Sequence, residues 1–200
     1  IISENGNLFV LWAKGELLKY SYEQDTFKQI LALKNVKFLS FKILNSTTII
    51  IGLQKGLLVY DLESKNLSKV LHYKAMFNRR IHLKENKIYV ATTKGIIVYD
   101  YVQNPTRLVK RKTLLKTIEV LDFDFDNQNR IWVGTYQKGL FVIDNENVQK
   151  IKLYDERIKT YTIRALKFDN NNKVLISLEG SGLFIICLLY TSPSPRDEKV

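Results

Sequence analysis

Arg130–Asp144 reads RIWVGTYQKGLFVID and holds two apolar runs on either side of a short turn that ends in Gly139. Both runs, Ile131–Val133 and Leu140–Ile143, have the length of a strand and are rich in β-branched and aromatic residues. Two such runs joined by a glycine-containing loop predict a β-hairpin. Neither run alternates cleanly with polar residues, so we expect protein to cover both faces of this hairpin.

The same hairpin pattern occurs five times along the chain. Its turn glycines are Gly15, Gly56, Gly95, Gly139 and Gly182. Their spacing of about 40 residues is the period of a four-stranded β-propeller blade. Helix pairs repeat with similar periods, but no segment shows the i, i+3, i+4, i+7 apolar spacing of a helix. The sequence therefore predicts an all-β fold, a β-propeller of four-stranded antiparallel blades, with residues 1–186 as one domain.

We expect this propeller to be incomplete, with three whole blades and two partial ones. The whole blades are Val36–Tyr73, Arg80–Lys112 and Ile118–Leu153, and the partial blades are Ile1–Leu33 and Ile163–Ile186. The repeat is cut at both ends and the first methionine is Met76, so we expect the natural protein to continue in both directions. Open blade edges of this kind favour aggregation.

The C-terminal segment breaks the repeat in the middle of a blade. Cys187–Asp197 reads CLLYTSPSPRD, a string that resembles the translation of a sequencing adapter. We therefore interpret residues 187–200 as a non-native tail and exclude them from the fold prediction. A natural C-terminal tail is the alternative. The only cysteine lies in this segment, so cysteine content does not indicate a redox compartment.

The chain is strongly basic, with a formal net charge of +11 and a pI near 9.6. Such a charge can indicate an anionic partner. The favoured alternative is compositional, because the chain is rich in Lys, Asn and Ile, the residues that an AT-rich genome encodes. We expect no nucleic-acid partner. No apolar stretch has the length of a membrane-spanning helix.

One repeat carries a family likeness. Asp126–Thr135 reads DNQNRIWVGT and is followed by Gly139. It resembles the repeat of the two-component regulator propeller family, Asp-x-x-Gly-x-Leu-Trp-x-Gly-Thr-x-x-Gly-Leu-x-x-Tyr-Asp. It departs from that pattern at Asn129, which replaces Gly, in one extra loop residue before Gly139, and at Ile143, which replaces Tyr. The second half of the pattern recurs at Gly56–Asp61 and Gly95–Asp100.

The resemblance implies a ligand-sensing, periplasmic segment of an inner-membrane two-component regulator. It implies that this segment is non-catalytic, that it recognises a small molecule or an oligosaccharide, and that it needs no cofactor. It also implies histidine kinase domains in the same polypeptide and a homodimer of the full-length protein. The residues alone predict a propeller of unknown function, because a fold does not specify a function.

Two other functional classes remain open. A propeller enzyme of the lyase or lactonase type would need a cluster of His or carboxylate side chains at the channel mouth. His72 and His82 are the only histidines, and they lie on predicted strands of different blades with no acidic or Ser partner at motif spacing. We therefore predict no catalytic residues. The other class is a protein–protein interaction platform.

Basic residues mark a candidate ligand-binding face. Lys14, Lys55, Lys94 and Lys138 each precede a turn glycine. Strand alternation places the second-to-third turns and the outer-to-inner connections at the same end of a propeller, and we expect Arg79 and Arg80 in one such connection. We hypothesise that this face receives an anionic or sugar ligand. The favoured alternative is that these lysines are solvated turn residues.

Aromatic residues at the same face could stack on sugar rings. Trp12 and Tyr136 lie at the turn edge and are the candidates for such contacts. Trp132 lies in the middle of an apolar run, so we expect it in the blade core instead.

Three aspartates alternate along one predicted strand. Asp122, Asp124 and Asp126 share one face of an extended chain. The calcium-loop pattern fails, because Asn127 and Val133 stand where that loop needs Gly and Glu. We therefore expect no metal site, and we expect these carboxylates to line a solvated central channel.

Overall fold

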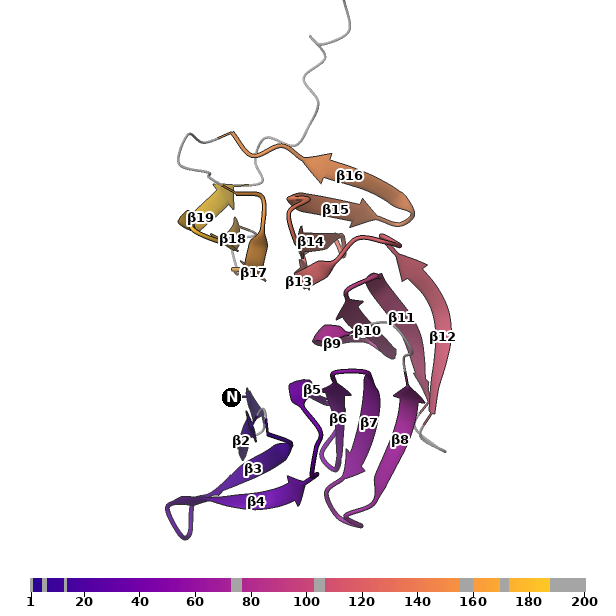
Figure 1. Cartoon of the computed structure of the whole chain (residues 1–200), viewed down its shortest axis with the longest axis vertical. Helices are drawn as coiled ribbons and strands as arrows, with labels where there is room; N and C mark the ends of the chain where they lie inside the picture. The colour runs from indigo at the N-terminus through magenta and orange to yellow at the C-terminus, as the bar shows by residue number, and fades with distance from the viewer. Residues whose placement is uncertain are drawn as a thin grey trace, which may run out of the picture. The chain divides into compact units, whose positions relative to one another are not determined.

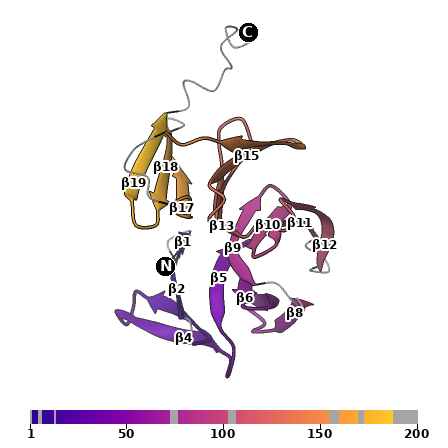
Figure 2. The same cartoon turned by 45° about the horizontal axis from the view of Figure 1, so that its top comes forward.

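The computed structural model describes residues 2–4, 7–12, 14–72, 77–102, 107–154, 160–169 and 173–187. The regular structure in these ranges consists of β-strands, which form antiparallel sheets in chain order (Figure 1). The chain divides into two units, Ile1–Thr117 and Ile118–Val200. Figure 2 shows the same sheets from a second direction.

The first unit contains three four-stranded sheets. The first sheet has the order β1(Ile2–Glu4), β2(Asn7–Trp12), β3(Glu16–Ser21), β4(Thr26–Ala32). The second sheet has the order β5(Phe38–Ile43), β6(Thr48–Leu53), β7(Gly56–Asp61), β8(Leu67–His72). The third sheet has the order β9(Asn78–Lys84), β10(Lys87–Thr92), β11(Gly95–Val102), β12(Arg107–Leu114).

The second unit contains one four-stranded sheet and one three-stranded sheet. The fourth sheet has the order β13(Val120–Phe125), β14(Ile131–Thr135), β15(Leu140–Asp144), β16(Asn147–Ile151). The fifth sheet has the order β17(Ile163–Phe168), β18(Lys173–Leu178), β19(Gly182–Cys187). Within each unit the four-stranded sheets are the meanders that the repeat predicts.

The β14–β15 hairpin forms in the predicted register. Trp132 pairs with Val142, and Val133 pairs with Phe141. All five residues of β14 are buried, so this strand is covered on both faces as the apolar run predicts. Trp132 is 1% exposed, which confirms that it belongs to the core.

Neighbouring sheets of a unit bury each other's middle strands. In the first unit, one apolar core joins the first and second sheets and another joins the second and third. In the second unit, a core around Trp132 joins the fourth and fifth sheets. A Cβ atom on Gly134 would lie 2.6 Å from Cγ2 of Ile163 on the next sheet, so only glycine fits at this close approach.

Candidate functional site

In the second, third, fourth and fifth sheets, one repeated backbone hydrogen bond joins the end of the second strand to the start of the inner strand. The residue after the second strand donates to the carbonyl oxygen of the residue before the inner strand. The donor–acceptor pairs are Gln54–Lys37 at 3.2 Å, Thr93–Phe77 at 3.1 Å, Tyr136–Glu119 at 3.0 Å and Glu179–Thr162 at 3.0 Å. We call this end of each sheet its turn end. The second-to-third turn and the connection into the inner strand therefore lie at the same end of these sheets, as the sequence predicts.

Two turn glycines are needed because backbone passes directly against them. Gly15 and Gly95 have φ angles of 94° and 95°, a region that favours glycine. A Cβ atom on Gly95 would overlap the carbonyl oxygen of Leu114, and one on Gly15 would overlap that of Leu33. The outer strand therefore closes on the turn, which fixes the direction of the side chains at the turn end.

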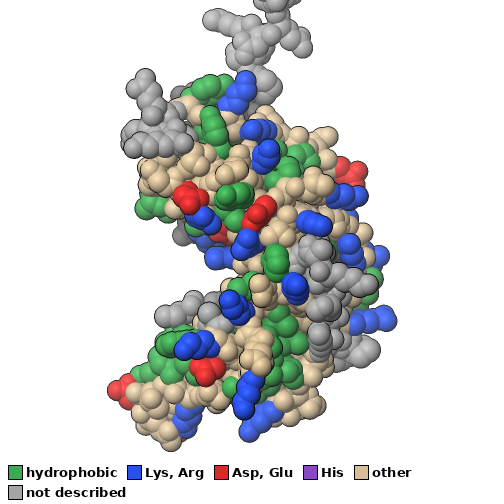
Figure 3. Space-filling view, in the orientation of Figure 1, with side chains coloured by type: hydrophobic (Ala, Val, Ile, Leu, Met, Phe, Trp, Pro, Cys, Tyr) green, Lys and Arg blue, Asp and Glu red, His purple; other side chains and the backbone are tan. Residues whose placement is uncertain are grey.

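The predicted lysines of the first unit lie at equivalent turn positions of three different sheets. Lys14, Lys55 and Lys94 are all exposed. The Nζ atom of Lys55 lies 5.7 Å from the ring centroid of Phe77, a cation–π contact with the connection to the next sheet. Trp12, at the end of β2, is 51% exposed. The positive side chains seen in Figure 3 are spread over the surface rather than gathered in one cluster.

Arg79 and Arg80 lie in strand β9 and not in the preceding connection, so that prediction was wrong. The strand starts at Asn78, whose buried side-chain amide donates to the carbonyl oxygens of Leu53, at 2.8 Å, and Gly56. This anchor brings the chain into the sheet one residue before Arg79. Both arginines are exposed.

In the second unit, two exposed tyrosines are held on a rigid backbone. Tyr136 follows β14 and is 41% exposed, and Tyr161 precedes β17 and is 55% exposed. The amide of Gly139 donates to the carbonyl oxygen of Tyr161 at 3.0 Å, which joins the two segments directly. Lys138 is exposed in the same turn.

Thr162 connects the turn ends of the fourth and fifth sheets. Its side chain is buried, with the residue 2% exposed, and its Oγ1 accepts a hydrogen bond from the amide of Gln137 at 3.1 Å. Its carbonyl oxygen accepts from the amide of Glu179. One buried residue therefore sets the positions of the turn that carries Tyr136 and of the turn that carries Glu179.

An ion pair lies near Tyr136. Arg164 donates to Glu179 at 2.9 Å, and both side chains are about half exposed. The hydrogen bond and the charge of Glu179 raise the pKa of Arg164, with smaller contributions from Tyr136 and Glu119. We call Tyr136, Tyr161, Arg164 and Glu179 the two-tyrosine surface. It combines exposed aromatic rings with a hydrogen-bond donor and an acceptor.

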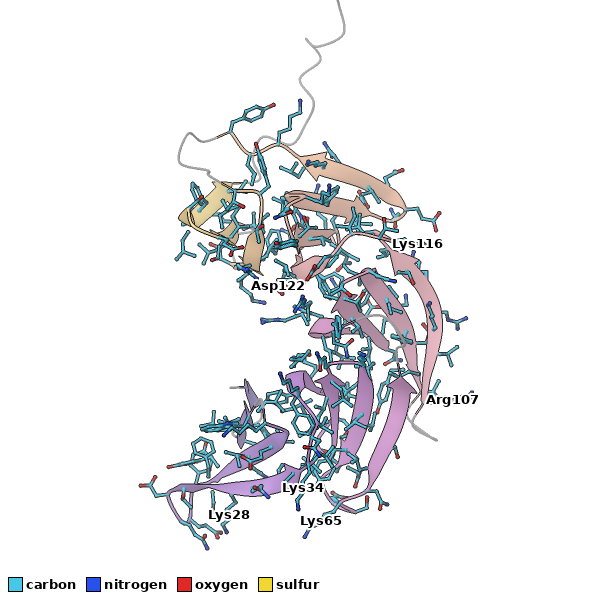
Figure 4. All side chains as sticks on the ribbon, viewed as in Figure 1. Lys28, Lys34, Lys65, Arg107, Lys116 and Asp122 are labelled. Carbon is cyan, nitrogen blue, oxygen red and sulfur yellow. The ribbon has the colours of Figure 1, made fainter. Side chains whose placement is uncertain are left out.

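The aspartates of β13 do not line a solvated channel, so that expectation was wrong. Asp122 and Asp124 are 3% and 7% exposed. Asp122 accepts the amide of Leu166 at 3.1 Å, and Asp124 accepts the amide of Phe168 at 3.2 Å and Lys167 Nζ at 2.8 Å. Figure 4 labels Asp122 where β13 faces β17. These carboxylates satisfy backbone donors of the adjacent inner strand, which makes them structural ties between blades.

Asp126 is also structural. It accepts hydrogen bonds from the side chains of Arg130 at 2.7 Å and Trp132 at 2.9 Å. Burial alone would raise the pKa of Asp126, but these hydrogen bonds outweigh burial and lower it. Its bonds to the amides of Gln128 and Arg130 shape the β13–β14 turn. Asp126 is therefore committed to the fold and cannot serve as a ligand group.

Among the described residues, no three His, Cys, Asp or Glu side chains are grouped to hold a metal ion. His82 lies on β9 and is partly buried, and the side chain of His72 lies outside the described residues. Within the described residues, no helix has the length and apolar character that crossing a membrane requires.

Of the two-tyrosine surface, the sequence predicted Tyr136 as a ligand-binding residue but not the other three members. Tyr161, Arg164 and Glu179 belong to the following repeat, where the sequence prediction named no ligand-binding residue. The available signal was the position of Tyr161, which lies two residues before an inner strand and therefore near a turn end.

No family model matches the chain, and no curated protein matches its sequence. Several solved structures are similar to it. One is the extracellular domain of BT3049 from B. thetaiotaomicron, described as a hybrid two-component system, with a TM-score of 0.72 and 18% identity over 91% of this chain and 25% of that chain. Another is PorZ, a surface component of the type-IX secretion system of Porphyromonas gingivalis, with a TM-score of 0.71 and 16% identity over 90% of this chain and 30% of that chain.

A computationally designed protein, Ika8, has a TM-score of 0.65 and 13% identity over 92% of this chain and 56% of that chain. This chain thus spans between a quarter and just over half of these three chains. At such identities the similarities show the fold alone. The fold is all-β, an incomplete β-propeller made of four-stranded antiparallel blades.

Proposed function

We propose that this chain is a ligand-sensing, extracytoplasmic propeller segment of a two-component signal transduction regulator. The observation that carries the proposal is the two-tyrosine surface, where Tyr136 and Tyr161 stand exposed on backbone fixed by Thr162. Aromatic rings bind the apolar faces of sugars, and the nearby Arg164 and Glu179 offer a donor and an acceptor for hydroxyl groups. The ligand class that this chemistry suits is an oligosaccharide.

The two-component role is supported by the structural similarity to extracellular domains described as parts of such systems. We propose that the segment lies in the periplasm, that histidine kinase domains belong to the same polypeptide, and that the full-length protein is a homodimer. In this arrangement the segment itself is non-catalytic. Its task is to bind the ligand and to pass the change on to the kinase.

Binding of oligosaccharides to the purified chain tests the proposal. The chain is titrated with a panel of neutral and acidic oligosaccharides by calorimetry. We expect at least one member to bind, and we expect Tyr136→Ala and Tyr161→Ala each to weaken that binding by about tenfold or more, as loss of about 1.4 kcal/mol would do.

The matched control is Tyr22→Ala in the β3–β4 turn of the first sheet, because Tyr22 is 67% exposed but belongs to the first unit and is not a member of the two-tyrosine surface. This variant should bind as the unchanged chain does. Absence of binding to every member of the panel contradicts the carbohydrate proposal. Binding that Tyr22→Ala weakens as much as Tyr136→Ala does contradicts the assignment of the site.

A further inference from the structure

The turn glycine of the fourth sheet is covered by side chains rather than by backbone. Gly139 has a φ angle of 86° and occupies the same turn position as Gly15 and Gly95. At Gly15 and Gly95, an added Cβ atom would overlap carbonyl oxygens of the backbone that passes the turn. At Gly139, the three atoms nearest to an added Cβ are Cε of Lys150 at 3.7 Å and Cδ1 and Cβ of Tyr161 at 3.8 and 3.9 Å. Lys150 and Tyr161 therefore lie together over the same buried glycine.

This contact places the ammonium group of Lys150 beside an exposed aromatic ring. Lys150 on β16 and Tyr161 before β17 are both exposed, although part of each side chain rests on Gly139. A lysine that packs its methylene groups against protein keeps its ammonium group in water. Because Nζ is one bond beyond Cε, a positive charge stands next to the ring of Tyr161. The amide of Gly139 donates to the carbonyl oxygen of Tyr161 at 3.0 Å, so the backbone beneath both groups is tied together.

The charges around this turn leave Lys150 open to an external anion. Arg164 is already bonded to Glu179 at 2.9 Å. No carboxylate among the residues that the structure describes forms an ion pair with Lys150. Lys138, directly before Gly139, is also exposed and adds positive charge to the same turn. The net charge of the chain, +11, favours the approach of an anionic ligand.

We propose that Lys150 binds the anionic group of an acidic sugar, a carboxylate or a sulfate, while the sugar ring stacks on Tyr161. This inference rests on the proposed function and narrows its ligand from oligosaccharides in general to acidic ones. The tyrosine ring takes the apolar face of the sugar, and the ammonium group makes charge-assisted hydrogen bonds with the anion. Lys150 is then a specificity-determining residue, because it favours acidic sugars and contributes little to the binding of neutral ones.

Paired ligands test this inference on the full 200-residue chain. Short hexuronate oligosaccharides are compared by calorimetry with their methyl esters, and sulfated oligosaccharides with their desulfated forms. We expect at least one acidic ligand to bind about fivefold or more tightly than its neutral partner, as an exposed charge pair allows, and this advantage to shrink as salt rises. The pair that shows the difference identifies the anion.

The same titrations separate the two proposals. If no ligand binds, acidic or neutral, the proposed function and this inference fall together. If acidic and neutral partners bind equally well, this inference falls and the proposed function stands.

Variants of Lys150 test the assignment of the residue. Lys150→Gln should lower the affinity for the acidic ligand about fivefold and leave the affinity for its neutral partner unchanged. Lys150→Arg keeps the charge and should retain most of the affinity. An acidic ligand that binds Lys150→Gln as tightly as the unchanged chain overturns the proposal.

Lys173→Gln is the matched control. It removes the same charge from an exposed residue in the same unit, at the β17–β18 turn, which lies at the opposite end of the fifth sheet from its turn end. This variant should bind both ligands as the unchanged chain does. Equal losses in Lys173→Gln and Lys150→Gln would mean that overall charge attracts the ligand, and would overturn the role of Lys150.

Discussion

The indole nitrogen of Trp132 donates a hydrogen bond of 2.9 Å to the carboxylate of Asp126. The same carboxylate binds Arg130, and its side chain is fully buried. A single group therefore holds both the β13–β14 turn and the largest residue of the second unit's core. Asp126→Ala should lower the free energy of unfolding by about 3 kcal/mol, because it leaves buried donors without a partner.

Asp169→Ala is the matched control for this prediction. Asp169 occupies the equivalent turn of the fifth sheet and accepts the amide of Lys173 at 2.7 Å, but at an exposed site. Its loss should cost about 1 kcal/mol. Urea unfolding of both variants measures the difference, and equal losses would contradict the role assigned to Asp126.

Stability should fall in acid through Asp124 and Asp126. Burial alone would raise both pKa values, but hydrogen bonds, from Lys167 and Phe168 to Asp124 and from Trp132 and Arg130 to Asp126, lower them below the ordinary 3.8. A lowered folded-state pKa gives stabilisation that is complete above the unfolded-state value and is lost as pH falls through the folded-state value. Urea midpoints measured from about pH 6 to pH 2 should therefore drop below about pH 4.

Asp126→Asn provides the comparison for the acid experiment. The variant lacks one of the two titrating carboxyl groups, so its midpoint should depend less steeply on pH in that range. Parallel curves for the variant and the unchanged chain would show that Asp126 does not contribute.

Gly95→Ala should destabilise the chain more than Gly182→Ala. The two glycines occupy the same turn position with φ angles of 95° and 93°. A Cβ atom on Gly95 would overlap Leu114, whereas one on Gly182 would have no neighbour within 4 Å. We expect about 1 kcal/mol for the backbone strain alone at Gly182, and at least about 2 kcal/mol at Gly95. Thermal or urea unfolding gives both values.

Thr162→Val should loosen one turn without unfolding the sheet. Valine keeps the shape of threonine but cannot accept the hydrogen bond from the amide of Gln137. Amide hydrogen exchange at Gln137 should become faster, while the amide of Gly139, which bonds to the carbonyl oxygen of Tyr161, should change little. Equal acceleration at both amides would indicate general destabilisation instead.

The turn lysines should matter only for anionic ligands. Lys55→Ser with Lys94→Ser removes two exposed cations at turn ends of the first unit. If an acidic oligosaccharide binds there, the double variant should lower its affinity and flatten the salt dependence of binding. Unchanged affinity would remove the hypothesis of a cationic ligand face. A neutral oligosaccharide of the same length is the control ligand.

The repeated hairpin could be predicted because the residues that determine it lie close together in the sequence. Trp132 and its neighbours combine strand-forming residues, two-sided apolar character and a turn glycine, and the structure has the predicted pairing of Trp132 with Val142. The buried state of Trp132 followed from the same run. Periodicity along the chain then predicted the sheets.

The aspartates and Arg79 could not be placed in this way. Alternation shows that Asp122 and Asp124 share a face. The backbone amides that donate to them belong to β17, 44 residues further along the chain. The start of β9 depends on the side chain of Asn78 reaching the neighbouring sheet. The two-tyrosine surface likewise needs Thr162 to join two repeats. These are tertiary contacts, which one repeat does not encode.

In the second to fifth sheets, a hydrogen bond joins the turn to the inner strand, and this bond affects which residues can change during evolution. It uses only main-chain atoms, as between Tyr136 and Glu119. An exposed side chain at a turn end, such as that of Tyr136, can therefore be exchanged by mutation while this main-chain bond is kept. A new chemical preference can then arise by substitution of exposed residues in one blade.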